Sequence, residues 1–536
     1  MKDLSITLAQ INPTVGDLAA NAQKILRVWA ESADDLVVFP ELVLCGYPPE
    51  DLVINPNFIT AIERKIDHIC KSSVDFAAAA LITCPWRIDG AVYNCALLIE
   101  YGAIKAITAK HELPNYGVFD ELRVFSAGAL PSPIDFRGSR LGIMICEDMW
   151  FDRVAGHLKA QGAEILIIPN GSPWRIGKEA VRDAHAKARV GETGLPLVYV
   201  NQIGGQDELV FDGHSFVMNA NGQIVLRLQE FEEDTATYCH PEPQANDLKS
   251  QTKDPLASPH DNTQSVYKAL TLGLRDYVNK NGFPGILLGL SGGIDSALAA
   301  AIAVDAIGAD HVKAYMLPSP YTSQDSLDDA KECAQSLGIS YEIISIKPAM
   351  QAFESSVPNL HGIAHENMQS RSRGVILMAL SNASGHMLLT TGNKSEMAVG
   401  YATLYGDMNG GFNALKDVYK TQVYALSKWR NDQGRVIPER IITKAPSAEL
   451  RDNQTDQDSL PDYDVLDDIL LGLIEHQDSL EIIAARGHDL TVIEKVARLL
   501  RLSEYKRYQA PPGTKITTRA FSRDRRYPMT NGWKFD

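Results

Sequence analysis

The stretch "GLSGGIDSALAAA", from Gly289 to Ala301, decides how the second half of this chain folds. The apolar run "GILL" precedes it and an alanine-rich run follows, a pattern typical of a strand, a tight turn and a helix. Gly292 and Gly293 let the backbone adopt positive φ and approach a ligand closely. Ser291 and Ser296 place hydroxyls at a helix N-terminus, which favours an anion. The stretch predicts either a capped turn or a cradle for phosphate.

Outward from this stretch, short apolar runs alternate with helical patterns. Helices are predicted over 265–280, 295–308 and 326–338, and strands over 285–290, 312–318 and 341–346. This alternation predicts a doubly wound sheet of parallel strands. After about Ser427 the chain becomes helical and charged, and it ends in the basic tail "RAFSRDRRYPMTNGWKFD". We find no long-range repeat.

The first half of the chain is a second α/β module. Strands are predicted over 4–10, 36–41, 95–100, 140–147, 164–170, 197–205 and 214–220. Between the halves, residues 241–263 are rich in Pro, Asp, Asn, Ser and Thr and have little apolar periodicity. We therefore expect one domain over 1–243, a linker over 244–262 and a second domain over 263–536.

Composition restricts the class of protein. A chain of 536 residues is too long for one ordinary core, and its 45% hydrophobic and 22% charged content is that of a globular protein. The net charge of −16 argues against DNA or an anionic membrane as the main partner. Seven cysteines form no CxxC pair, which favours a reducing compartment. With no secretory segment or membrane-spanning run, we expect a cytoplasmic protein.

Three segments of the first half carry reactive residues. Cys146 follows an apolar run in "LGIMICEDMW", Glu41 ends a predicted strand in "VVFPELVLCGYP", and Lys110 opens "KHELPNYGVFDE". Each alone is ordinary, because free cysteines are mostly inert packing and loop charges are mostly solvated. Together, in this order and with these flanks, they resemble the nitrilase superfamily of carbon–nitrogen hydrolases over residues 4–240. The resemblance implies an N-terminal αββα sandwich.

The resemblance also implies the chemistry of an amidase. Cys146 would attack the amide carbon, Glu41 would move the proton, and Lys110 would stabilise the oxyanion. Glu121 is a further carboxylate in the same segment. Family members that use glutamine grip its polar ends with the positions that match Tyr116, Ser172 and Lys178, the last two within "NGSPWRIGK". Ordinary hydrogen bonding within loops is the alternative for these three residues.

The glycine-rich stretch of the second half lacks the GK[ST] of a Walker loop. It resembles the PP-loop of N-type ATP pyrophosphatases, which implies an adenine nucleotide alpha hydrolase-like fold. Asp295 would bind Mg²⁺, because that ion prefers carboxylate and phosphate oxygens; a first-turn carboxylate that complements the helix dipole is the alternative. The implied contacts with ATP are Gly289, Leu290, Ser291, Gly292, Gly293, Ile294, Asp295 and Ser296.

Two later motifs narrow the choice among PP-loop enzymes. "ENMQSRSRG" (366–374) and "TTGNKSEMAVGYATLYGDMNGG" (390–411) resemble the NAD synthetase family over about residues 260–536. By this resemblance Thr391 contacts ATP and Glu396 is a second acidic group near the metal. The implied contacts with deamido-NAD⁺ (nicotinic acid adenine dinucleotide) are Asn367, Glu396, Asp407, Lys420 and Lys506.

The two resemblances together imply a glutamine-dependent synthesis of NAD⁺ that uses glutamine, ATP and deamido-NAD⁺, with Mg²⁺. Free ammonia at neutral pH is mostly ammonium, which is not a nucleophile, so an amidase fused to the ligase makes chemical sense. A tunnel between the two sites is a hypothesis that follows from this need. The family precedent implies a homo-oligomer built through the synthetase domain.

Three other functions stay open at this level. A related PP-loop enzyme would form a different amide, a metabolite-binding or scaffold protein would keep a degenerate amidase half, and the "RDRRYP" cluster would bind nucleic acid. The 390–411 block speaks against the first, and the intact set of Glu41, Lys110 and Cys146 against the second. The third has only a local charge cluster behind it.

Overall fold

The computed structural model describes residues 4–240, 262–451 and 454–533, and the chain divides into two compact units. The first comprises Met1–Gln206 and Val210–His260, and the second comprises Asp207–Leu209 and Asp261–Asp536. The predicted linker, 244–262, lies outside the described residues except for Asn262, which begins a helix. The exact domain limits therefore remain predictions.

Within the described part of the first unit, two six-stranded sheets and a two-stranded ribbon form. The first sheet has the order β14-β1-β2-β3-β4-β5, with β1 (Leu4–Gln10), β2 (Leu36–Val38), β3 (Ala79–Ile88), β4 (Ala91–Glu100), β5 (Ala103–Ala109) and β14 (Asp234–His240). The second has the order β13-β12-β9-β8-β7-β6, with β6 (Ile134–Phe136), β7 (Ser139–Ile143), β8 (Ile165–Asn170), β9 (Leu197–Asn201), β12 (Phe216–Met218) and β13 (Ile224–Arg227). The ribbon pairs β10 (Ile203–Gln206) with β11 (Leu209–Asp212).

The two sheets pack face to face because their strands are apolar on both sides. In β8, Ile165 and Ile167 join Ile6 and Leu8 of β1 in one buried cluster. The alternate residues of β8 belong to a second cluster shared with α3 (Asp152–Ala160) and α4 (Lys178–Thr193). A strand buried on both faces reads as a continuous apolar run, which is how "EILIIPN" reads.

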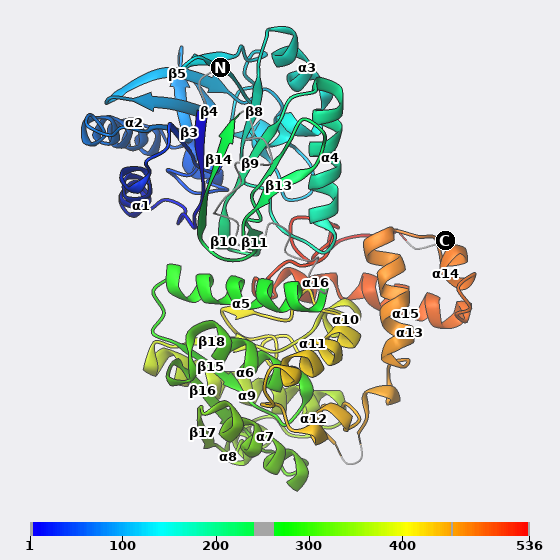
Figure 1. Ribbon diagram of the computed structural model, residues 1–536. Coiled ribbons are helices and arrows are strands. Elements are labelled where there is room, and N and C mark those ends of the chain that lie inside the picture. Colours follow the sequence, from blue (N-terminus) through cyan, green and yellow to red (C-terminus); the bar gives the residue numbers. More distant parts are fainter. Residues whose placement is uncertain (1–3, 241–261, 452–453, 534–536) are drawn as a thin grey trace. The chain divides into compact units, whose positions relative to one another are not determined.

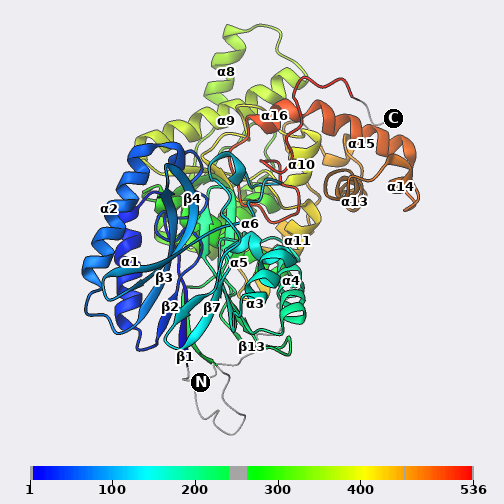
Figure 2. The same cartoon turned by 90° about the horizontal axis from the view of Figure 1, so that it is seen from above.

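Helices cover both outer faces of this pair of sheets. Figures 1 and 2 show α1 (Leu18–Glu31) and α2 (Pro56–Ser72) beside β3 on one side, and α3 with α4 on the other. Trp29 of α1 is fully buried, and its indole donates to the Ala78 carbonyl at 2.9 Å. The predicted αββα sandwich is confirmed.

Two of the predicted strands end earlier than expected. β2 stops at Val38, so Glu41 lies in a turn, and β7 stops at Ile143, so Cys146 begins a 3₁₀ turn, η3 (Cys146–Trp150). Residues 39 and 42–45, and Met144 with Ile145, are nonetheless almost fully buried. Each apolar run therefore predicts which residues are buried, and burial continues beyond the last residue of the strand.

In the second unit, the described residues form a five-stranded sheet whose pairs are all parallel. Its order is β17-β16-β15-β18-β19, with β15 (Ile286–Gly289), β16 (Val312–Met316), β17 (Ser340–Ile343), β18 (Met387–Thr390) and β19 (Phe412–Asn413). The chain builds outward from β15 to β17 and then returns to the other side of β15. This reversal is the switch point at which doubly wound sheets bind ligands, beyond the carboxyl ends of β15 and β18.

Helices wind on both faces of this sheet (Figure 1), as predicted. On one face α6 packs against α7 and β16, with α5 and α11 behind α6; on the other, Leu377 and Leu380 of α9 pack on Leu287 and Leu388. The helices are α5 (Asn262–Lys280), α6 (Ile294–Ile307), α7 (Gln324–Leu337), α8 (Lys347–Ser356), α9 (Ile363–Ser384), α10 (Lys394–Val399), α11 (Lys420–Asp432) and α12 (Glu439–Thr443).

A helical cluster completes the second unit. It contains α13 (Tyr463–Leu471), the π-helical turn Gly472–His476, α14 (Leu480–Ala484), α15 (Leu490–Leu502) and α16 (Glu504–Tyr508). Apolar residues of α13, α14 and α15 share a buried core with α10. The helical character predicted after Ser427 is confirmed, and this cluster holds the 390–411 motif against the rest of the unit.

A buried cation ties the C-terminal segment to that motif. Lys394 is fully buried, and its Nζ lies 2.7 Å from Asp417 and 2.5 Å from Glu475. The same Nζ donates to Thr517 Oγ1 at 2.7 Å and to the Arg519 carbonyl at 3.0 Å. One ammonium group thus satisfies partners from three distant segments.

We expect Lys394→Met to destabilise the second unit by about 3–5 kcal/mol, because it leaves two buried carboxylates without their cation. Urea unfolding followed by circular dichroism measures the change. Lys428→Met, on the exposed face of α11, is the matched control and should stay within about 0.5 kcal/mol of the wild type. Equal midpoints for the two variants would contradict the anchoring role.

Candidate active sites

The three residues predicted for amide hydrolysis meet inside the first unit. Glu41 follows β2, Lys110 follows β5 and Cys146 follows β7. Glu41 and Lys110 are fully buried, and Cys146 is 3% exposed. The Lys110 Nζ donates to Glu41 Oε1 at 2.6 Å, and the charges of both residues act on the Cys146 thiol. The structure therefore gathers all three in one buried cluster.

The Cys146 thiol is held in its protonated form. Burial raises its pKa well above the usual range and the charge of Glu41 raises it further, while Lys110 opposes the shift. A thiol with a raised pKa needs a base before it can act as a nucleophile. Glu41 is the carboxylate whose charge acts most strongly on this thiol, so it is placed to be that base.

Both oxygens of Glu41 have fixed partners besides Lys110. Asn94 Nδ2 donates to Oε1 at 2.7 Å, and the Gly171 amide donates to Oε2 at 2.9 Å. A Cβ at Gly171 would lie 2.9 Å from the Tyr47 ring, so only glycine brings this amide close enough. The sequence did not indicate a role for Asn94, because the segment around it has the pattern of an ordinary β-strand.

Glu121 joins the same cluster. Lys110 Nζ donates to its two oxygens at 2.9 and 2.8 Å, and the Tyr47 hydroxyl donates to Oε1 at 2.9 Å. Burial raises the pKa of Glu121 to about 7, against the opposing charge of Lys110. Lys110 thus sits between two carboxylates, one on each side of its ammonium group.

The backbone around Cys146 is unusual. Cys146 has φ of +45°, in the left-handed region that non-glycine residues rarely adopt. Asp148, fully buried two residues later, accepts the Ile145 amide at 2.9 Å and the His111 and Glu112 amides at 3.1 and 2.8 Å. One aspartate therefore fastens the Cys146 turn to the loop that carries Lys110, a connection that the sequence did not reveal.

Two of the predicted glutamine contacts touch residues that follow Cys146 in the chain. The Tyr116 hydroxyl donates to Glu147 at 2.9 Å, and Lys178 Nζ lies 3.9 Å from the centre of the Trp150 ring. Burial lowers the pKa of Lys178 to about 7, aided by the like charges of nearby arginines. A nearby anionic ligand would raise the pKa of this amine and restore its protonated form, so Lys178 is suited to bind an anion.

Ser172 is held by a buried polar network. Arg182 Nε donates to Ser172 Oγ at 3.2 Å, and Arg182 itself pairs with Asp212 at 2.7 Å. The Ser172 amide donates to Asn201 Oδ1 at 2.9 Å. The guanidinium has no acceptor, so Ser172 Oγ must accept from it. No motif in the sequence indicated that this network would form, and its other members are Arg182, Asn201 and Asp212.

In the second unit, the glycine-rich stretch forms the turn between β15 and α6. Gly292 has φ of +80°, and a Cβ there would lie 2.4 Å from the Ser326 carbonyl oxygen. The Ser291 amide donates to Ser296 Oγ at 3.2 Å, and within the described part of the chain no side chain caps the first turn of α6. The first-turn amides are therefore available to an anion. Thr391, which directly follows β18, lies at the same edge of the sheet.

The predicted acidic pair of this unit shares one cation. Lys420 Nζ bonds Asp295 Oδ2 and lies 3.5 Å from Glu396 Oε1. Asn393 Nδ2 donates to Asp295 Oδ1 at 2.8 Å, and Asn393 also caps α10, which carries Glu396. Burial and then the charge of Asp295 raise the pKa of Glu396 to about 8. A second cation beside Lys420 would favour the charged form of Glu396.

This charge pattern fits a divalent cation. Asp295 and Glu396 present carboxylate oxygens, the ligands that Mg²⁺ prefers, and their side chains are 18% and 17% exposed. Among the described residues, no three His, Cys, Asp or Glu side chains gather to hold a metal by themselves. Mg²⁺ usually keeps waters and phosphate oxygens in addition to one or two carboxylates.

The residues predicted to contact the dinucleotide also converge. Thr403 Oγ1 donates to Asn367 Oδ1 at 2.9 Å, and the Thr403 amide donates to Asp407 Oδ1 at 2.7 Å. Lys506 Nζ donates to the Gly400 and Ala402 carbonyls, each at 2.7 Å. Residues from α9, from the 400–407 loop and from α16 therefore form one polar cluster, although their spacing in the sequence did not require it.

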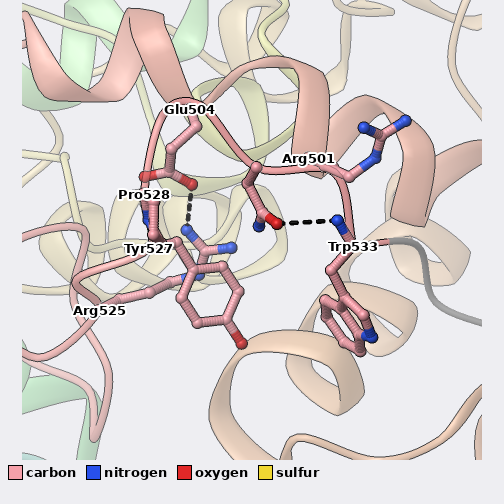
Figure 3. Close-up of a pocket in the computed structure, with 7 residues that line it drawn as sticks. Arg501, Glu504, Arg525, Tyr527, Pro528 and Trp533 are labelled. Carbon is pink, nitrogen blue, oxygen red and sulfur yellow. Dashed lines mark hydrogen bonds and ion pairs between the residues drawn. The ribbon is translucent and has the colours of Figure 1, made fainter.

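Figure 3 shows a small pocket in the C-terminal segment. Arg525 pairs with Glu504 there, and its guanidinium carbon lies 3.9 Å from the centre of the Tyr527 ring. Its lining contains none of the predicted site residues: Arg501, Glu504, Arg525, Tyr527, Pro528, Asn531 and Trp533.

Comparison with known families identifies both modules. Residues 5–239 match the carbon–nitrogen hydrolase family, and residues 266–510 match the NAD synthase family. The site that contains Cys146 lies in the first match and the glycine-rich turn in the second. The molecule is thus a carbon–nitrogen hydrolase joined to an NAD synthase.

Similar proteins span the whole chain. It is 48% identical to a glutamine-dependent NAD(+) synthetase from Rhodobacter capsulatus, over 99% of this chain and 98% of that protein. It is 44% identical to one from Acinetobacter baylyi over the full length of both. A solved structure of the glutamine-dependent NAD+ synthetase from Acinetobacter baumannii with ADP is 41% identical, covers both chains fully and has a TM-score of 0.78. The chain belongs to the family of glutamine-dependent NAD(+) synthetases.

None of the described helices combines the length and the apolar character that crossing a bilayer requires.

Proposed function

We propose that this chain converts deamido-NAD⁺ to NAD⁺ with ATP, using ammonia that it releases from glutamine. The observation that carries the proposal is the presence, in one chain, of the buried Cys146–Glu41–Lys110 cluster and of the SGGIDS turn beside the Asp295–Glu396 pair. Its relatives of similar length bear the name of this activity. The names of these relatives support NAD⁺ as the product, rather than the amide of another nucleotide carboxylic acid.

Glutamine hydrolysis would take place in the first unit. Glu41 takes the proton of the Cys146 thiol, and sulfur attacks the carboxamide carbon of glutamine to form a tetrahedral oxyanion. Lys110 stabilises that negative charge. The C–N bond then breaks, Glu41 returns the proton to the leaving nitrogen, and ammonia departs. Water, activated by Glu41, hydrolyses the thioester and releases glutamate.

Lys178, Tyr116 and Ser172 would hold the amino-acid end of glutamine. We give the three residues different tasks in this proposal. The Lys178 ammonium pairs with a carboxylate, and the Ser172 hydroxyl, which accepts from Arg182, turns its own hydrogen toward an acceptor on the ligand. Tyr116 is already bonded to Glu147, so it shapes the pocket together with that carboxylate.

We expect the KM for glutamine to be constant below about pH 7 and to rise above it, because the pKa of Lys178 is lowered to about 7. Above that pH the neutral amine no longer pairs with the ligand's carboxylate, and KM rises by up to about tenfold per pH unit. Steady-state kinetics at several pH values, corrected for the ammonium-supported rate, measures this dependence.

Lys178→Arg is the matched variant, because a guanidinium stays charged throughout this range. It should show a KM for glutamine that no longer depends on pH above about 7. A pH dependence that the arginine variant shares with the wild type would assign the titration to another group.

Adenylation would take place in the second unit. The amides of the SGGIDS turn hold the β- and γ-phosphates of ATP at the N-terminus of α6. A carboxylate oxygen of the substrate's nicotinate ring attacks the α-phosphorus, and the bond from that phosphorus to the bridging oxygen breaks. Pyrophosphate leaves and an acyl adenylate remains. Thr391 would contact ATP, and Lys420 would balance negative charge at the reacting carboxylate.

Asp295 and Glu396 would hold Mg²⁺ together with phosphate oxygens, and the ion would neutralise phosphate charge when bound. Asn393 orients Asp295 for this task through its 2.8 Å hydrogen bond. Asn367, Asp407 and Lys506 would contact deamido-NAD⁺, with Glu396 and Lys420 at its reactive end. Ammonia finally attacks the acyl carbon, the C–O bond to AMP breaks, and NAD⁺ and AMP are released.

Further features belong to the same proposal. The catalytic units would correspond to residues 1–243 and 263–536, joined by a linker over 244–262. The protein would act in the cytoplasm as a homo-oligomer. Ammonia would pass from one site to the other without mixing with bulk solvent.

The test of the function is NAD⁺ formation by the wild-type protein from deamido-NAD⁺, ATP and Mg²⁺, with glutamine or ammonium chloride as nitrogen donor. We expect one AMP and one pyrophosphate for each NAD⁺, and one glutamate when glutamine is the donor. Failure to form NAD⁺ with either donor would refute the proposal, and a panel of other nucleotide carboxylic acids would then be assayed.

A further inference from the structure

Asn94 is a polar side chain at the start of a buried apolar stretch of β4. The five residues that follow it are Cys, Ala, Leu, Leu and Ile, and all of them are buried. The Asn94 side chain is itself fully buried. Burying an amide among apolar neighbours costs free energy unless its hydrogen bonds are made. Asn94 is therefore expected either to have both ends of its amide bonded or to serve the site beside it.

Asn94 contacts two members of the amidase cluster. Its Nδ2 group donates to Glu41 Oε1 at 2.7 Å, and its main-chain carbonyl accepts the Lys110 amide at 2.8 Å. The Lys110 Nζ donates to the same Oε1 at 2.6 Å. Asn94 thus holds the proposed base with its side chain and the residue that would stabilise the oxyanion with its backbone.

Glu41 fixes which end of the Asn94 amide faces it. An ionised carboxylate only accepts hydrogen bonds, so the NH₂ end must point at Oε1 and the carbonyl oxygen must point elsewhere. That oxygen, Oδ1, is buried and accepts no hydrogen bond from the described residues. The side chain therefore has a single partner among them, and that partner is Glu41.

Asn21, a buried asparagine of α1, shows the hydrogen bonds of a structural role. Its Oδ1 accepts the Thr14 amide at 2.9 Å, and its Nδ2 donates to the Thr14 and Leu44 carbonyls at 2.8 and 3.1 Å. Both ends of the amide are used, as is usual for buried polar groups. Asn94 leaves one end bare, so its side chain contributes less to the fold than that of Asn21.

The two oxygens of Glu41 differ in what they can still accept. Oε1 accepts from Lys110 Nζ and from Asn94 Nδ2, and these two donors occupy both of its lone pairs. Among the described residues, Oε2 accepts only the Gly171 amide, at 2.9 Å, and so keeps one lone pair. Oε2 is therefore the oxygen that is able to take a proton.

We propose that Asn94 is a positioning residue that holds Glu41 by Oε1, so that Oε2 takes the proton of the Cys146 thiol. This role rests on the proposed function of the first unit and adds a residue to it. The S–H bond breaks and an O–H bond forms at Oε2, while sulfur keeps the electron pair with which it attacks the amide carbon. An amide suits the task because it orients the carboxylate and adds no charge to the cluster.

Asn94→Leu tests this role, because leucine keeps the size of the side chain and removes the donor. In the complete reaction mixture, kcat for glutamate release should fall about 10–100-fold. The KM for glutamine should stay within about twofold, because the bonds of Asn94 go to Glu41 and Lys110 and not to the predicted glutamine contacts. NAD⁺ formation with ammonium chloride should also stay within about twofold of the wild type.

The pH profile gives the decisive measurement. The acid limb of kcat/KM for glutamine should move to higher pH by about one unit in Asn94→Leu. The reason is that a carboxylate that loses a hydrogen-bond donor is protonated more readily. Asn94→Ser, whose hydroxyl is too short to reach Glu41, should shift the limb in the same direction and replaces Asn94→Leu if leucine prevents folding.

Asn21→Leu is the matched control, since it removes a buried asparagine of the same unit that lies outside the amidase cluster. It should melt at a lower temperature than the wild type and keep the acid limb in place. Asn94→Leu should melt within about 3 °C of the wild type, because leucine also removes the bare Oδ1. Thermal unfolding followed by circular dichroism measures both variants.

Glutamate release by Asn94→Leu at the wild-type rate would overturn the proposed role. An unmoved acid limb would overturn it as well, whatever the melting temperature, because a structural asparagine such as Asn21 behaves in that way. Failure of the wild type to release glutamate from glutamine would refute the proposed function instead, so the two failures are distinguishable.

Discussion

Cys146→Ala is expected to lose glutamine-supported NAD⁺ formation by at least about 1000-fold and to keep ammonium-supported formation within about twofold of the wild type. The thiol is the proposed nucleophile for the amide carbon, and without it no thioester forms. The second unit contains its own proposed nucleotide site, so added ammonia bypasses the missing step. Parallel assays of NAD⁺ and glutamate with each donor measure both effects.

The cluster around Cys146 makes this variant a sharp test. Lys110 and Glu41 pair with each other at 2.6 Å without the thiol, so their arrangement survives its removal. Cys70→Ala, a half-buried cysteine of α2, is the control and should retain both activities. Loss of the ammonium-supported rate in Cys146→Ala would mean that the first unit supports the second in some way other than by supplying ammonia.

Asp295→Asn is expected to lower NAD⁺ formation about 10²–10³-fold with either nitrogen donor. The amide keeps the hydrogen-bonding shape but removes the negative charge that pairs with Lys420 and that would hold Mg²⁺. Adenylation precedes amide formation, so the choice of donor makes no difference to this variant. Pyrophosphate release and NAD⁺ formation, measured together over a range of Mg²⁺ concentrations, should fall in parallel.

Asp310→Asn, at an exposed aspartate three residues after α6, separates this effect from a general change of charge. It should match the wild type at every Mg²⁺ concentration. If Asp295→Asn reached the wild-type rate at saturating Mg²⁺, the residue would contribute only metal affinity. If it matched the wild type throughout, Asp295 would be a first-turn carboxylate of α6 and no more.

Local patterns allowed the fold of both units to be predicted from the sequence. The Gly292–Gly293 turn is flanked by an apolar run and an alanine-rich run. This strand–turn–helix junction was predictable because it depends only on local φ preferences and on nearby hydroxyl groups. The alternation of strands and helices that follows then leaves a parallel sheet as the simplest arrangement. Strand ends were less predictable, since apolar residues continued past Val38 and Ile143 wherever the chain stayed buried.

The partners of the site residues could not be predicted in the same way. Tyr47 reaches Glu121 across 74 positions of sequence, and Asn94 reaches Glu41 across 53. Such contacts arise only when the sheets assemble, and a tyrosine or an asparagine within a strand has many ordinary roles.

The left-handed backbone at the nucleophile has a consequence for protein engineering. A residue with a Cβ at φ of +45° costs about 1–2 kcal/mol, and glycine removes that cost. Glycine, which has no reactive side chain, would therefore be the more stable residue at position 146. Selection for catalytic activity and selection for thermal stability act on this position in opposite directions. Between two inactive variants, Cys146→Gly should melt at a higher temperature than Cys146→Ala, which makes the glycine form the better choice for trapping intact glutamine in a crystal.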